Sequence, residues 1–209
     1  MVEFPPHKFN GPQNHPNPIP TITNPQFSGS MVDYVKMIAQ SAHRAQPEFN
    51  LYRGIIPGWD NTARRQNSPT IVVNNHPELY GAWLSYLRAY TRHTQAKPEN
   101  SFLFINAWNE WGEGCHLEPD LRWGLRFLEE TKRSIWYDSA DIPLAASRAR
   151  LAALVREIIK TQHIPAAPDI SVYRPKNPLV PKFSLALQRF PALHRLIRWF
   201  YHRAHALLK

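Results

Sequence analysis

A continuous apolar run over residues 102–105 constrains the fold of this chain more than any other feature. Four apolar residues follow one another there without a polar break, which is typical of a strand covered on both faces in a parallel sheet. Residues 51–57 and 70–73 form two earlier apolar or β-branched runs, and helical patterns lie between the runs. Strands that alternate with helices in this way predict βα units around a parallel sheet.

Apolar residues at helical spacing predict four helices, at residues 31–44, 77–93, 123–134 and 143–162. Ser30 is the expected N-cap of the first helix, and Pro77 suits the first turn of the second. A short β-prone segment at residues 2–4 precedes a long proline-rich loop. No glycine-rich phosphate-binding loop is present, so no nucleotide cofactor is expected.

The net charge of +9 is concentrated in the last 47 residues, which carry eight Lys or Arg and one acid. After a body at residues 1–162, we expect a proline-rich linker at 163–189 and a basic amphipathic helix at 190–209. The helix is expected to bind an anionic membrane surface, with packing on the body or on another protein as the alternative. Because the body is nearly neutral and the tail has no nucleic-acid-binding fold, no nucleic acid partner is expected.

The first residues and the single cysteine bear on where the protein works. Residues 1–7 have no basic segment followed by an apolar one, so they do not read as a signal peptide. No apolar run approaches the roughly 20 residues that a membrane span needs. Cys115 alone excludes an intrachain disulfide and a cysteine-based zinc site. We therefore expect a cytoplasmic protein that is soluble or peripherally membrane-bound.

The chemistry is expected just after the apolar run, where Asn109, Glu110, Trp111 and Glu113 follow one another closely with two glycines. In parallel βα folds, reactive residues gather at the carboxyl ends of strands. Cleavage of a glycosidic bond needs a proton donor and a second carboxylate, and Glu110 and Glu113 are the candidates for these roles. Trp111 offers a flat apolar face on which a sugar ring can stack.

Two other interpretations of these acids remain open from the residues alone. A Glu-x-x-Glu spacing is most often a solvated helix face. Alternatively, Glu110, Glu113, His116 and Glu118 are oxygen and imidazole ligands close together in the sequence. The His-Glu-x-x-His pattern of metalloproteases is absent, so no metal is expected.

Two further strand ends carry polar and aromatic residues that suit recognition of sugar hydroxyls. Trp59, Asp60 and Asn61 follow the run at 51–57, although an Asx turn would explain Asp60 or Asn61 equally well. Glu3 and His7 lie at the end of the short segment near the N-terminus. We predict that all five residues, together with Asn109, Trp111 and His116, contact substrate.

Several motifs taken together resemble the WbsX-type proteins of bacterial polysaccharide gene clusters, which are similar to glycoside hydrolase family 99. They are Glu3–His7, Tyr52–Arg64, Pro77–Tyr80, Phe104–Gly114 and His116–Asp120. The resemblance implies the C-terminal portion of a (β/α)8 TIM-type barrel, followed by the basic helical tail. A full barrel takes about 250 residues, so we expect either that the chain is a fragment, a truncated copy of such a protein, or that another chain or domain completes it.

Family 99 enzymes cleave internal α-mannosidic linkages with retention, and the resemblance carries specific roles over to this chain. It implies that Glu110 assists the 2-hydroxyl of the sugar and that Glu113 is the general acid and then the general base. Gly112 departs from the hydrolase motif, where a histidine often stands. The expected partner is an oligosaccharide or polysaccharide. The alternatives are a non-catalytic module for glycan binding or assembly, and a glycosyltransferase-associated protein.

Overall fold

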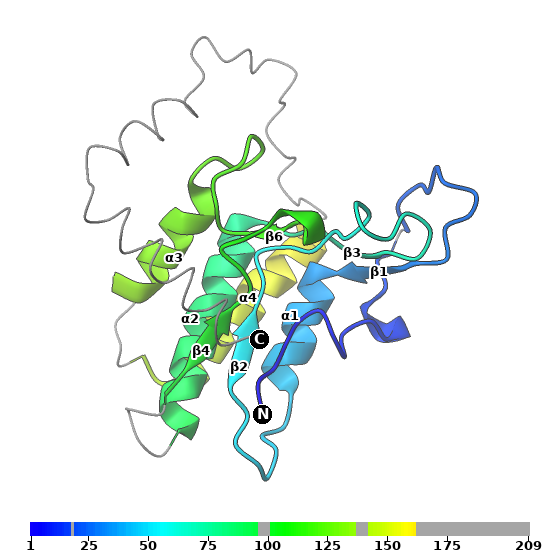
Figure 1. The fold of residues 1–209 in the computed structure, drawn as a ribbon. Coiled ribbons are helices and arrows are strands. Elements are labelled where there is room, and N and C mark those ends of the chain that lie inside the picture. The colour runs from blue at the N-terminus through cyan, green and yellow to red at the C-terminus, as the bar shows by residue number, and fades with distance from the viewer. Residues whose placement is uncertain (18, 96–100, 137–141, 162–209) are drawn as a thin grey trace, which may run out of the picture. The chain divides into compact units, whose positions relative to one another are not determined.

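The computed structural model describes residues 1–161 apart from 18, 96–100 and 137–141. The linker predicted at 163–189 and the basic helix predicted at 190–209 lie outside the described residues. Figure 1 shows the elements along the chain. They are η1 (Pro12–Asn14), β1 (Ser30–Asp33), α1 (Tyr34–His43), β2 (Arg53–Ile55), β3 (Thr70–Val73), α2 (Pro77–Thr94), β4 (Leu103–Ile105), β5 (Asn109–Glu110), η3 (Trp111–Glu113), β6 (Cys115–His116), α3 (Arg126–Trp136) and α4 (Leu144–Thr161).

The predicted α/β organisation, with parallel strands that alternate with helices, is confirmed. Val2 forms a parallel bridge to Tyr52, and β2 pairs in parallel with β4, with Gly54 opposite Phe104. Helices α1 and α2 connect these three strands in turn. A second parallel pair joins β1 to β3, and β5 with β6 forms a small antiparallel hairpin. The described residues do not close into a barrel.

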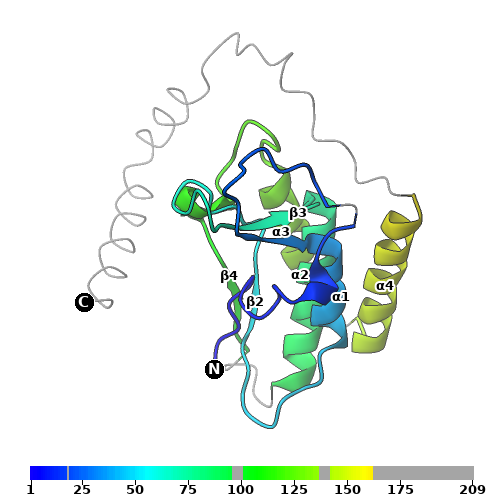
Figure 2. The ribbon, with the colours of Figure 1, turned by 90° about the vertical axis from the view of Figure 1, so that its right-hand side faces the viewer.

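The helices cover one face of the β2–β4 pair. Figure 2 shows the two strands on one side, α1 and α2 next to them, and α4 beyond. Trp83 of α2 is fully buried between the layers, and its indole donates a hydrogen bond to the Ser41 hydroxyl of α1 at 3.0 Å. Aliphatic and aromatic side chains from both helices and from β2 form one continuous core. This core holds the strands, and therefore their carboxyl ends, in fixed positions.

The other face of the same strands is open among the described residues. Phe102 and Phe104 are 52% and 46% exposed, and Phe4 is 47% exposed. Tyr52 contacts both Phe102 and Phe104 edge-on, with ring centroids 5.9 and 6.3 Å apart. The expectation that the apolar run is covered on both faces is therefore not met here, since only Leu103 and Ile105 pack against the core.

The start of the first helix differs from the prediction. Residues 31–33 were expected to be helical with Ser30 as the N-cap, but they belong to strand β1, which pairs with β3. Asp33 is the N-cap instead, and its Oδ1 accepts hydrogen bonds from the amides of Val35 and Lys36. A carboxylate that satisfies two free amides is a stronger helix start than a position three residues earlier.

None of the helices in the described part of the chain is long and apolar enough to cross a membrane.

Candidate functional site

The predicted acids lie on one tight hairpin beyond the end of β4. We call residues 109–116 the acid-bearing turn: β5 and β6 form its two sides and η3 its tip. Gly114 has φ of 55°, a left-handed conformation that glycine adopts at little cost. The turn therefore places Glu110 and Glu113 at the carboxyl end of the β2–β4 pair, with side chains 49% and 21% exposed.

Both carboxylates contact one arginine that the sequence did not single out as a site residue. Arg64 Nη1 donates to Glu113 Oε1 at 2.9 Å, and Arg64 Nη2 lies 3.5 Å from Glu110 Oε2. Arg64 belongs to the loop after β2, more than 45 residues earlier in the chain. The only sequence signal for it was its place in the motif that begins at Tyr52.

A stacked pair of rings flanks the two acids. The rings of Trp111 and His116 lie 3.8 Å apart between centroids and are nearly parallel, at 20°. The Trp111 indole donates to Glu118 Oε2 at 2.7 Å, and His116 Nδ1 lies 3.0 Å from the Glu118 carbonyl oxygen. Across the described residues, no three His, Cys, Asp or Glu side chains are arranged to hold a metal ion. The Glu118 carboxylate is instead engaged with the Trp111 indole.

A pocket of about 350 Å³ adjoins the acid-bearing turn and contains three of the predicted contact residues, Trp59, Asp60 and His116. We call it the polar pocket. Its wall also includes residues that sequence reasoning did not propose: Asn74, Asn75, Asp120, Arg122 and Trp123. Asn74 and Asn75 directly follow strand β3, and this position at a strand end was the signal that could have identified them.

The loop that carries Asp60 and Asn61 is held by its own side chains. Asp60 Oδ1 accepts from the Thr62 amide at 3.0 Å, and Asn61 Oδ1 accepts from the Thr70 amide at 2.8 Å. Asp60 also donates its backbone amide to the Glu113 carbonyl at 2.7 Å. The predicted Asx turn is therefore present, and it ties this loop to the acid-bearing turn.

The two N-terminal candidates lie in different places. Glu3 is buried beneath the sheet, where its carboxylate accepts from Arg53 Nε at 2.8 Å and Arg44 Nη1 at 2.7 Å. These contacts account for Glu3 without a substrate, so we leave it out of the proposed site. His7 is exposed, and the centroid of its ring lies 6.3 Å from that of Trp59. His7 is therefore next to a residue that lines the polar pocket.

The cysteine within the turn is buried. Burial raises the pKa of the Cys115 thiol to about 12. The thiol is therefore protonated, and it donates to the Asn106 carbonyl at 2.8 Å.

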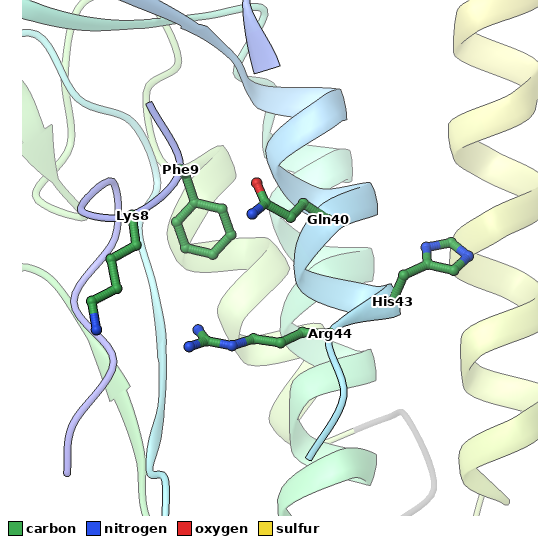
Figure 3. Close-up of a pocket in the computed structure, with 5 residues that line it drawn as sticks. All are labelled: Lys8, Phe9, Gln40, His43 and Arg44. Carbon is green, nitrogen blue, oxygen red and sulfur yellow. The ribbon is translucent and has the colours of Figure 1, made fainter. Parts of the chain in front are cut away.

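A second cavity, of about 330 Å³, lies beside α1 and is lined by Lys8, Phe9, Gln40, His43 and Arg44. Figure 3 shows Arg44 extending from α1 toward the segment with Lys8, whereas His43 points away toward α4. None of the predicted contact residues lines this cavity, and Arg44 is already paired with Glu3. It is therefore a separate feature from the acid-bearing turn.

Comparison with known proteins gives one family. The family model described as glycosyltransferase WbsX matches residues 2–131. Two proteins named uncharacterized protein WxcX, from two strains of Xanthomonas campestris pv. campestris, are each 36% identical over 134 residues. Those residues are 64% of this chain but 19% of each relative, so the chain spans about a fifth of the length of these curated relatives. No solved structure matches the chain.

Proposed function

The chain belongs to the WbsX family, a carbohydrate-active family of polysaccharide biosynthesis, and on that premise we propose that the acid-bearing turn supplies the carboxylates of a glycan site. The reaction is cleavage or transfer of a glycosidic bond in a cell-surface polysaccharide. One observation carries the proposal: Glu110 and Glu113 contact the same guanidinium at the carboxyl end of the strands, next to the polar pocket.

The two acids take different roles in this chemistry. Glu113 serves as the general acid and then as the general base, and Glu110 assists the 2-hydroxyl of the sugar. Such a pair matches the need for a proton donor at the leaving oxygen and a second carboxylate at the sugar. Both side chains reach solvent, as groups that meet a ligand must.

The polar pocket and the stacked rings suit the sugar units beside the reacting bond. The pocket volume of about 350 Å³ falls within the roughly 300–1,000 Å³ of small-ligand sites. It combines aromatic surface from Trp59 and Trp123 with amides and carboxylates that can bond hydroxyl groups. His116 lines this pocket and stacks on Trp111, so a glycan can run from the pocket to Glu113 along one wall.

The open aromatic face of β2 and β4 supports a further part of the proposal. In a parallel barrel this face points inward and is covered by the strands opposite. A further chain or domain that contributes such strands would cover Phe102 and Phe104 and enclose the glycan from the other side. We expect the 209-residue chain by itself to turn over little polysaccharide, and robust turnover by it would contradict this part.

A glycan-binding or assembly module is the second candidate function. It is favoured by the ion pairs of Glu110 and Glu113 with Arg64, because both acids have a partner in the glycan-free chain. Carboxylates held in this way can bond hydroxyl groups without any step of bond cleavage.

Replacing Glu113 by Gln tests the first function against the second. The change is made in this chain and at the equivalent position of the longer WxcX relative, with Glu129→Gln on the exposed face of α3 as the matched control. We expect the relative to lose cleavage or transfer by about 100-fold or more, while polysaccharide binding by both proteins weakens by no more than about 10-fold. Unchanged turnover would refute a catalytic role, and joint loss of turnover and binding would favour the binding module.

Attachment of residues 190–209 to an anionic membrane surface stays a prediction from the sequence. Flotation with vesicles that contain anionic lipid, for the full chain and for a chain that ends at residue 162, measures it. Equal flotation of the two would contradict it.

A further inference from the structure

Arg64 contacts both acids, but neither the family match nor the sequence motifs assign it a role. Its guanidinium uses two different nitrogens for two different carboxylates, Glu113 at 2.9 Å and Glu110 at 3.5 Å. An arginine that forks onto one carboxylate would fix that acid alone. This bridging arrangement instead couples the positions of both acids to a single side chain.

The backbone that carries Arg64 is fixed in place. The amides of Arg64 and Arg65 both donate to the Asn61 carbonyl, at 3.0 and 2.9 Å. The same loop is tied to the acid-bearing turn through the Asp60 amide and the Glu113 carbonyl. Arg64 therefore starts from a rigid support, although its side chain is 57% exposed.

Gly112 leaves the space that the guanidinium occupies. A Cβ at position 112 would lie 2.9 Å from Arg64 Nε and 3.4 Å from Arg64 Nη2. The first of these distances is shorter than real Cβ contacts, so a side chain at 112 would push the guanidinium aside. Gly112 therefore leaves open the space in which the guanidinium contacts both acids.

We infer that Arg64 is a positioning residue of this site, which sets the orientation of the Glu110 and Glu113 carboxylates. Its guanidinium does so from the space that is left because Gly112 has no side chain. This inference rests on the proposed function, because it takes these two acids as the groups that meet the glycan. Arg64 acts on the acids and not on the sugar. Its guanidinium restricts the rotamers of both carboxylates before a glycan arrives, which lowers the ordering cost of binding.

The contact can be tested in the glycan-free 209-residue chain by ¹³C NMR of the glutamate carboxyl groups, assigned with Glu110→Gln and Glu113→Gln. We expect Arg64→Gln to shift both signals. Arg65→Gln is the matched control, because Arg65 is exposed, adjacent and without an ion pair in the described part of the chain. If Arg64→Gln leaves both carboxyl signals where they are in the unchanged protein, the inference is wrong.

Gly112→Ala provides a second, independent way to move Arg64. This change alters no charge and should shift both carboxyl signals, since the Cβ displaces the guanidinium. In the Arg64→Gln background it should add little, because the two changes act on the same contact. Additive shifts would show that Gly112 acts on the acids by another route. They would refute the claim that Gly112 acts by leaving space for the Arg64 guanidinium.

Arg64→Lys separates positioning from mere positive charge. A lysine offers one compact charge and not a planar fork, so it should restore the Glu113 signal and leave the Glu110 signal shifted. Recovery of both signals would show that charge alone suffices and would contradict bridging by the guanidinium.

A parallel titration with polysaccharide tests the positioning role of Arg64 separately from the proposed glycan-site function on which it rests. We expect Arg64→Gln and Gly112→Ala to weaken polysaccharide binding by about 10-fold, with melting temperatures close to that of the unchanged chain. If the carboxyl signals respond as expected and no variant or parent binds polysaccharide, the proposed function fails and the positioning role stands. If the parent binds and both variants bind equally well, Arg64 has no positioning role toward the glycan.

Discussion

Of the glutamate–arginine pairs in the described residues, two that have nearly equal length lie in opposite surroundings. Glu3 and Arg53 lie 2.8 Å apart, and Glu113 and Arg64 lie 2.9 Å apart. The side chains of the first pair are 3% and 1% exposed, whereas those of the second are 21% and 57% exposed. Distance alone therefore does not distinguish a structural pair from one that a ligand can reach.

The partners of the two pairs explain what the difference means. The Glu3 carboxylate also accepts from Arg44 and from the Gly54 amide, and Arg53 donates to Ser41 and lies 4.7 Å from the centre of the Tyr90 ring. In the described residues, Arg64 is the only hydrogen-bond partner of the Glu113 carboxylate. A carboxylate with few partners and access to solvent can exchange them for a ligand, and one enclosed by several donors cannot.

Breaking the buried pair is expected to have the largest effect on stability. Glu3→Gln removes the charge that compensates Arg53 and should lower the free energy of unfolding by about 3–5 kcal/mol. Urea denaturation of the 209-residue chain measures it, with the exposed Glu48→Gln as control, expected within about 0.5 kcal/mol. A loss below about 1 kcal/mol for Glu3→Gln would mean that burial does not set the two pairs apart.

His76 is buried and, among the described residues, has no oppositely charged side chain bonded to it, so we expect its effect on stability to lie between the effects of the two ion pairs. His76 is 2% exposed and caps α2, and burial lowers its pKa from the usual 6.5. Because the unfolded chain then binds more protons below pH 6.5, the stability from neutral His76 is present above that pH. It is lost as the pH falls through the lowered folded pKa.

The matched variant for this prediction is His76→Asn, which keeps an acceptor for the helix amides and does not titrate. Melting temperature should fall more steeply between pH 7.5 and pH 5 for the unchanged protein than for His76→Asn. Parallel pH profiles would contradict a role for this imidazole.

The exposed pair should contribute least to stability. Arg64→Gln is expected to change the free energy of unfolding by no more than about 1 kcal/mol, because solvent screens both partners. Adding 1 M NaCl should reduce even this difference, since the Debye length falls to about 3 Å. The effect of Glu3→Gln should be unchanged by the same salt, because both members of the Glu3–Arg53 pair are buried. A fall of both effects in salt would mean that burial does not separate the two pairs.

Sequence patterns predicted the elements better than their surroundings. The helix at Pro77–Thr94 was expected to within one residue of its end, because proline, acid and apolar spacing all agree there. The apolar run at 102–105 was expected to be buried on both faces, yet Phe104 is half-exposed. A run of apolar residues indicates that both faces of a strand can be buried. Whether each face is covered depends on the neighbouring elements.

The candidate site was predicted in part for the same reason. Glu110 and Glu113 follow a strand directly, so local order was enough to nominate them. Glu3 also sits at a strand end, and nothing in its neighbours indicates that its side chain turns toward the helices and two arginines. The polar pocket residues Asn74 and Arg122 come from separate loops that only the packed chain brings together.

The alternation of strands and helices and the place of the two acids along the chain follow from the sequence alone, because hydrophobic period and strand ends are local properties. Tertiary packing sets which glutamate is buried and which arginine holds the acids. Arg64 and Glu113 are 49 residues apart, so their contact depends on how β2 and β4 pair and on the space left at Gly112. Such long-range contacts follow from the path of the whole chain, and no local pattern encodes them.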